Sequence, residues 1–254
     1  MNAPLRAENL TIGHGKRSLL SGMDFPIYAG ELVALIGVNG IGKSTLLRTL
    51  AGLRSALAGD VRVEGVPIAS LSASRRARRV AIVLTGRPAT GQLDVETLVA
   101  LGRQPWTGRW GRLSAEDHAR VDRALRFAEA DHLRGKALHA CSDGECQKVL
   151  IARALAQDTP VLLLDEPTAF LDLPNRAAIV RMLRRIAQEE RKAVLFSTHD
   201  LQLALDLSDR LLLLRDGPLW NGTPAEAVAS GTLEHAFSGT GIHFDAGGGH
   251  RFER

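Results

Sequence analysis

A glycine-rich segment, Gly37-Val-Asn-Gly-Ile-Gly-Lys-Ser-Thr45, constrains the fold of this chain more than any other feature. It follows an apolar run, Leu32–Ile36, that predicts a buried strand, and it precedes a helical pattern from about Lys43 to Leu53. A strand, a glycine turn and a helix in this order form a phosphate loop, where backbone N–H groups and the helix N-terminus converge on phosphate oxygens. Lys43 adds a positive charge for the β- and γ-phosphates, and the Ser44 hydroxyl is a candidate magnesium ligand. The candidate phosphate-binding residues are Gly37, Asn39, Gly40, Gly42, Lys43, Ser44 and Thr45.

Two carboxylates follow a second apolar run and supply the acidic partner that a phosphate-bound metal needs. Val161–Leu164 predicts a buried strand, and Asp165 and Glu166 come directly after it. Ligands gather at the carboxyl ends of strands in open α/β sheets, so Asp165 is a candidate for the magnesium shell. Glu166 is placed to orient or deprotonate an attacking water. The alternative is that both carboxylates only cap a following helix.

Strand and helix patterns alternate along the chain, which predicts α/β architecture with a largely parallel central sheet. Two helical patterns, over 94–101 and 114–130, lie in a stretch without strand signals. We therefore expect one domain over 1–254 with a helical insertion at about 85–149, and a loose tail over 245–254. The further strand candidates are 79–84, 160–164, 193–197 and 210–215.

Composition narrows the class of protein. Apolar residues make up 45% of the 254, and a net charge of +4 permits an anionic partner without demanding nucleic acid. The apolar runs are far shorter than the ~18–20 residues of a membrane span, and the first residues lack a secretory signal pattern. Cys141 and Cys146 are too few for a zinc site and badly spaced for a disulfide. These observations predict a protein of the reducing cytoplasm.

The segment Cys141-Ser-Asp-Gly-Glu145 begins another predicted helix. Ser142 and Glu145 have the spacing of a capping box, which is the simplest interpretation. A helix N-terminus with a serine and a glycine can also hold a γ-phosphate. Because the phosphate loop lies elsewhere on the sheet, a second molecule would have to bring that phosphate.

The order of these motifs along nearly the whole chain resembles the ATP-binding subunit of ABC transporters. Asp165-Glu166-Pro-Thr168, Leu171-Asp172 and Ser197-Thr-His-Asp200 complete the series. The resemblance implies a P-loop ATPase core with an antiparallel N-terminal β part, and it implies ATP and Mg²⁺ as cofactors. It also implies a homodimer, peripheral at the cytoplasmic face of the cell membrane.

The resemblance assigns further site residues. Ser142 and Gly144 would meet the ATP of the partner copy, and Asp172 would lie in the loop that links the two sites. His199 would contact the γ-phosphate and hold the catalytic geometry. His14 would stack on adenine, in a place where the family has an aromatic ring, although a solvated loop histidine is the alternative.

Two positions depart from the family pattern. The signature of the family begins with Leu and carries two adjacent glycines, whereas this chain has Cys141 and Asp143. A carboxylate near a triphosphate is unfavourable unless it points away or pairs with a cation. Thr85 stands where the family has a glutamine that touches magnesium, so a bridging water would have to replace that contact, or the role is lost.

The segment Val95–Pro105 resembles the importers of iron–siderophore, haem or cobalamin compounds. In that subgroup two identical ATPase subunits act with membrane permease subunits and an extracytoplasmic binding protein. The alternatives are an ordinary amphipathic helix here and a transporter of another class. A soluble ATPase of DNA repair or of ribosomes is disfavoured, because the chain lacks both a long coiled coil and a second ATPase domain. The run Arg75–Arg79 could contact phosphate backbones, but clustered arginines more often form a solvated helix face. Because the chain also lacks a wider basic stripe, no nucleic-acid partner is expected.

Overall fold

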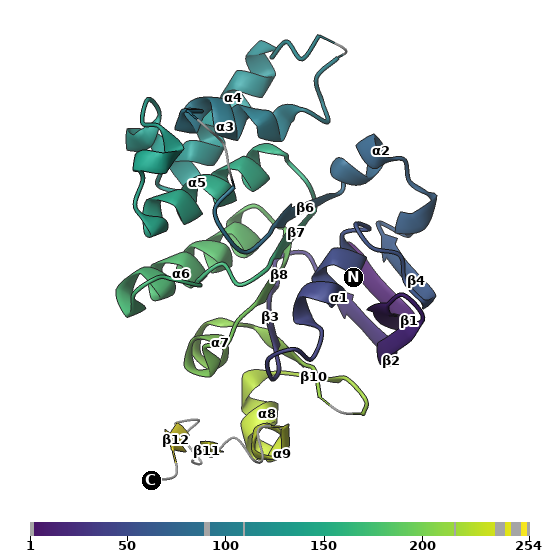
Figure 1. Ribbon diagram of the computed structural model, residues 1–254. Helices are drawn as coiled ribbons and strands as arrows, with labels where there is room; N and C mark the ends of the chain where they lie inside the picture. Colours follow the sequence, from purple (N-terminus) through teal and green to yellow (C-terminus); the bar gives the residue numbers. More distant parts are fainter. Residues whose placement is uncertain are drawn as a thin grey trace.

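The alternating apolar runs build a six-stranded sheet at the centre of the molecule (Figure 1). The computed structural model describes residues 3–88, 92–108, 110–215, 217–236, 242–244 and 250–252. All neighbouring pairs in this sheet are parallel except the pair at one edge, β10 with β9. In spatial order the strands are β10 (Trp220–Gly222), β9 (Arg210–Leu213), β3 (Leu32–Ile36), β8 (Ala193–Ser197), β7 (Val161–Leu164) and β6 (Val80–Val83). The predicted α/β class and its strands are confirmed, with ends that differ by one or two residues.

Strand β3 sends alternate side chains to two separate hydrophobic cores. Ala34 packs with the helices α5 (Asp143–Ala156) and α6 (Leu173–Glu189), whereas Leu35 packs with α1 (Lys43–Leu50). Helix α1 ends three residues before the predicted Leu53, because Gly52 has a φ of +67° that terminates the helix. The remaining helices near β8, β9 and β10 are α7 (Leu201–Leu207), α8 (Pro224–Ala229) and α9 (Thr232–Ala236).

A four-stranded antiparallel sheet covers the core that contains α1, as the family resemblance implied. Its strands, in spatial order, are β2 (Arg17–Ile27), β1 (Leu5–His14), β4 (Ala58–Val63) and β5 (Val66–Pro67). The short helices η1 (Ile68–Ser70) and α2 (Ala73–Ala77) lead from this sheet back to β6. Figure 1 shows this sheet and α1 on one side of the central sheet, with α5 and α6 on the other.

The predicted helical insertion packs against α5. It contains α3 (Val95–Ala100), η2 (Leu101–Arg103), α4 (Ala115–Phe127), η3 (Asp131–Leu133) and η4 (Leu138–Ala140). A Cβ on Gly102 would lie 2.3 Å from the carbonyl oxygen of Arg153, so only glycine permits this approach to α5. The buried Arg103 guanidinium donates to Asp117 Oδ1 and to the carbonyl of Ala156, at 2.8 Å each. The Gly-Arg pair therefore fastens the insertion to the end of α5.

The prediction of a loose tail over 245–254 is wrong for its part His250–Phe252. This part forms strand β12, antiparallel to β11 (Ile242–Phe244). The glycines suggested a loop, but aromatic residues favour strands and occur in both paired segments, and β11 also contains the β-branched Ile242. The other residues of the predicted tail lie outside the described part of the chain.

Candidate functional site

The lysine of the phosphate loop donates hydrogen bonds to the backbone of the same loop. Lys43 Nζ donates to the carbonyl oxygens of Gly37 at 2.8 Å and Val38 at 3.3 Å. Gly37, Gly40 and Gly42 have φ values of +150°, +79° and +118°, which L side chains rarely adopt. Burial lowers the pKa of the Lys43 ammonium, and the carboxylates of Glu166 and Asp165 partly offset this effect. The loop thus presents a buried cation and a helix N-terminus, which suit phosphate oxygens.

Asp165 lies at the carboxyl end of β7 and is only 2% exposed. Its Oδ1 accepts hydrogen bonds from Ser44 Oγ at 3.0 Å and from Ser197 Oγ at 2.9 Å. A serine hydroxyl beside a buried carboxylate is an all-oxygen donor set, which magnesium prefers. The chemistry of Ser44 and Asp165 therefore fits the predicted Mg²⁺.

Ser197 joins this site although its side chain was not predicted to take part. Its hydroxyl also accepts a hydrogen bond from Glu166 N at 2.8 Å. Leu164 pairs with Phe196 in the adjacent strand, so the next residue of each strand, Asp165 and Ser197, lies beside the other. The sequence signal for Ser197 was a serine at the end of an apolar strand. That signal does not show which residues the hydroxyl contacts, because those contacts depend on the order of the strands in the sheet.

Glu166 and His199 lie side by side at the same edge of the sheet. His199 Nε2 is 2.5 Å from Glu166 Oε1, and the carboxylate is partly buried whereas the imidazole is half exposed. Glu166 has a φ of +50°, a conformation that non-glycine residues seldom adopt and that occurs often at functional sites. The pair brings a carboxylate that can act as a base into direct contact with an imidazole that can hold it in place.

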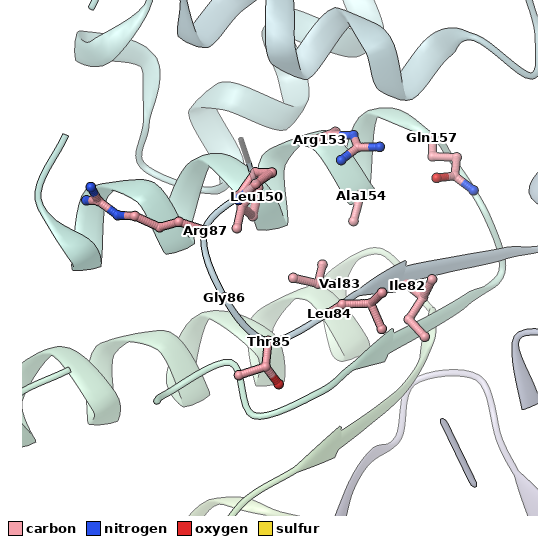
Figure 2. Close-up of a pocket in the computed structure, with 11 residues that line it drawn as sticks. Ile82, Val83, Leu84, Thr85, Gly86, Arg87, Leu150, Arg153, Ala154 and Gln157 are labelled. Atoms are coloured by element: carbon pink, nitrogen blue, oxygen red, sulfur yellow. The ribbon is translucent and has the colours of Figure 1, made fainter. Parts of the chain in front are cut away.

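Thr85 also reaches this site, from the end of β6. Its hydroxyl donates to the carbonyl oxygen of Asp165 at 2.8 Å, so its lone pairs remain able to accept from a water. Thr85 and Arg87 line a cavity of about 360 Å³ between the loop that follows β6 and α5 (Figure 2). The position is compatible with a bridging water, which is one of the two alternatives that the sequence leaves open.

His14 lies beside the phosphate loop. Its Nε2 is 3.3 Å from Thr45 Oγ1, and its Nδ1 is 3.0 Å from an Arg54 nitrogen. The ring is exposed at the end of β1, where a planar base could stack on it.

Ser142, Gly144 and Asp172 form a second group, at the starts of α5 and α6. Ser142 Oγ accepts from Glu145 N at 3.2 Å, and Glu145 returns the contact to Ser142 N, so the predicted capping box is confirmed. Asp172 caps α6 by accepting from Asn175 N at 3.0 Å, and a Cβ on Gly144 would lie 3.5 Å from the Asn175 side chain. Helices α5 and α6 pack on the face of the sheet opposite α1. Ser142 and Asp172 are exposed there and Gly144 is partly exposed, so the start of α5 is open to another molecule.

The family model for ABC transporters matches residues 20–169, which include the phosphate loop, Ser142 and Asp165–Glu166. The chain belongs to the ABC transporter family. As an ATP-binding subunit of this family, it binds ATP and is an ATPase coupled to transport.

Curated relatives agree with this assignment over most of their length. The hemin import ATP-binding protein HmuV of Streptomyces coelicolor is 41% identical, with 91% of this chain and 82% of that protein covered. The ferric enterobactin transport ATP-binding protein FepC of Escherichia coli is 34% identical, with 92% and 87% covered.

Solved structures show the same fold. A metal-chelate type ABC transporter in an inward-facing conformation aligns with a TM-score of 0.81 at 27% identity, over 93% of this chain and 89% of that one. The dimeric bacterial ABC transporter cassette MJ0796 aligns with a TM-score of 0.73 at 26% identity, over 87% and 98%. The predicted cassette fold is therefore confirmed.

Proposed function

We propose that this ABC subunit energises import of an iron–siderophore, haem or cobalamin compound. The observation that carries the proposal is its similarity, across about nine-tenths of the chain, to proteins named for import of hemin and of ferric enterobactin. A cobalamin import protein, BtuD of Halobacterium salinarum, is also 39% identical over 86% of the chain. The segment Val95–Pro105, which suggested this subgroup, supports the same substrate classes.

The side chains at the carboxyl edge of the sheet divide the work of ATP hydrolysis among them. The loop N–H groups, the α1 N-terminus and Lys43 bind the β- and γ-phosphates. Ser44 and Asp165 would hold Mg²⁺, which neutralises developing phosphate charge when bound. Glu166 takes a proton from the attacking water, and His199 keeps that carboxylate and the γ-phosphate aligned. Thr85 would accept a hydrogen bond from a water at this edge.

Each ATP would be shared between two copies of the chain. Ser142 and Gly144 of one copy offer a helix N-terminus to the γ-phosphate that the other copy holds, with Asp172 between the two sites. His14 stacks on the adenine. The exposure of the α5 start and the dimeric MJ0796 cassette support this arrangement.

The partners would be permease subunits in the cell membrane and, through them, an extracytoplasmic binding protein. Among the helices that the structure describes, none combines the length and apolar character of a membrane span. We infer that the chain binds the permease peripherally, on the cytoplasmic face.

Copurification tests this proposal. The tagged Glu166→Gln chain, isolated in detergent with ATP, should retain a many-helix membrane protein, and mass spectrometry should find a metal chelate or tetrapyrrole bound to the complex. Proteoliposomes of that complex with wild-type subunit should import the compound with ATP, whereas those with Glu166→Gln should not. Copurification with ribosomes or nucleic acid instead, with ATPase activity stimulated by them, would overturn the proposal.

A further inference from the structure

Both carboxylates in the first turn of α5 are paired with cations. Asp143 Oδ1 is 3.1 Å from Arg87 Nε, and Glu145 Oε2 is 2.7 Å from Lys136 Nζ. The second pair lowers the pKa of Glu145 and raises the pKa of Lys136. Acidic groups stabilise a helix start through its dipole, but they also repel an anion that approaches the same N–H groups. The two cations remove that repulsion.

Arg87 binds on both sides of Ser142. Besides its ion pair with Asp143, its terminal nitrogen donates to the carbonyl oxygen of Cys141 at 2.5 Å. One planar guanidinium therefore contacts the residue before the serine and the residue after it. Because the guanidinium fork is rigid, this double contact restricts how Ser142 can turn.

The loop that carries Arg87 also touches the catalytic edge of the sheet. Thr85, two positions earlier, donates to the carbonyl oxygen of Asp165. Figure 2 shows Thr85 near the sheet and Arg87 extending toward the start of α5. A three-residue segment thus links the backbone of Asp165 to the start of α5, which would complete the partner's site.

We propose that Arg87 is a positioning residue for the shared ATP site: it orients Ser142 and neutralises Asp143, so that the start of α5 accepts a γ-phosphate bound by a second copy. The inference rests on the proposed dimeric function. The Arg87 and Asp143 side chains are 44% and 60% exposed, and half-exposed pairs contribute little to folding stability. The pair therefore acts on association and turnover rather than on folding.

The test uses the Glu166→Gln background, in which ATP is bound but not consumed. Sedimentation velocity with ATP measures dimer formation, and a fluorescent ATP analogue measures binding to the dilute monomer. Arg87→Ala should weaken dimer formation about tenfold, because it leaves Asp143 unpaired beside the phosphate. Binding of the analogue to the monomer should stay unchanged, since the phosphate loop is untouched.

Two further variants separate charge from geometry, and a third is a control. Arg87→Lys keeps the charge without the fork and should give an intermediate dimer affinity. Arg87→Ala with Asp143→Ala should recover only the part of the loss that the unpaired carboxylate causes, because the contact with the Cys141 carbonyl is still missing. Arg62→Ala is the matched control: it breaks a similarly exposed pair with Glu8, 2.8 Å apart on the antiparallel sheet, and should dimerise like the parent.

The outcomes distinguish the inference from the function on which it rests. If Arg87→Ala dimerises like its parent, or loses monomer binding in equal measure, the inference is wrong and the proposed function stands. If the Glu166→Gln parent itself stays monomeric with ATP, the shared site is wrong and the inference falls with it.

Discussion

At the phosphate loop the charged side chains of Lys43 and Asp165 are buried, only 6% and 2% exposed, whereas at the start of α5 the paired Arg87 and Asp143 lie at the surface. Burial strengthens each electrostatic contact and protects it from salt, whereas water and ions weaken an exposed pair. Packing within the fold therefore fixes the positions of these side chains in the half of the site that holds ATP. The half that we propose to meet a partner copy depends on a few exposed charges.

The largest expected effect lies in the buried half. Glu166→Gln should lower turnover by about 10²–10⁴-fold while ATP still binds, because it removes the base and keeps the phosphate contacts. Lys43→Ala should instead weaken ATP binding itself. Equilibrium binding and steady-state hydrolysis measure the two effects. Parental hydrolysis rates in Glu166→Gln would show that another group is the base.

Substituting one serine in each half of the site compares the two halves directly. Ser197→Ala removes a buried hydroxyl that contacts both Asp165 and Glu166, and it should lower the free energy of unfolding by about 2–3 kcal/mol. Ser142→Ala removes an exposed N-cap and should cost about 1 kcal/mol. Urea denaturation without nucleotide gives both values. Equal costs would contradict the contrast between a buried and an exposed half.

A buried ion pair in the insertion predicts a pH dependence. The backbone N–H and hydroxyl of Ser114 and the Arg103 guanidinium lower the pKa of Asp117 from 3.8 to about 2. Its stabilising contribution, roughly 2 kcal/mol, should be complete above pH 3.8 and should be lost as the pH falls toward 2. Urea midpoints of wild type and Asp117→Asn should therefore converge on acidification. A constant gap across this window would contradict the assignment.

The smallest effect is expected at Thr85. If its hydroxyl holds a water of the magnesium shell, Thr85→Val should raise the magnesium concentration needed for half-maximal hydrolysis by a few-fold, with ATP binding retained. Thr85→Gln should lower that concentration, since a longer amide reaches the metal itself. Superimposable magnesium titrations of the three proteins would exclude Thr85 from the metal site.

The sequence predicted the contacts that arise within one strand–turn–helix unit. The phosphate loop, the Asp165 strand and the Ser142 capping box all depend on neighbours in the chain, and the structure confirms their local geometry. The role of Ser197 depends on β8 lying beside β7, and Arg87 meets Asp143 only when the insertion folds back. Contacts between residues so far apart in the chain produce no local sequence pattern from which they could be predicted.

Mixing two inactive subunits tests the shared ATP site most directly. Lys43→Ala lacks the phosphate contact, and Ser142→Arg blocks the helix start, so each alone should be nearly inactive. An equimolar mixture should regain roughly a quarter of the wild-type rate, because half of the dimers then hold one intact site. A mixture no more active than its parts, with a wild-type rate per chain that does not rise with protein concentration, would contradict sharing.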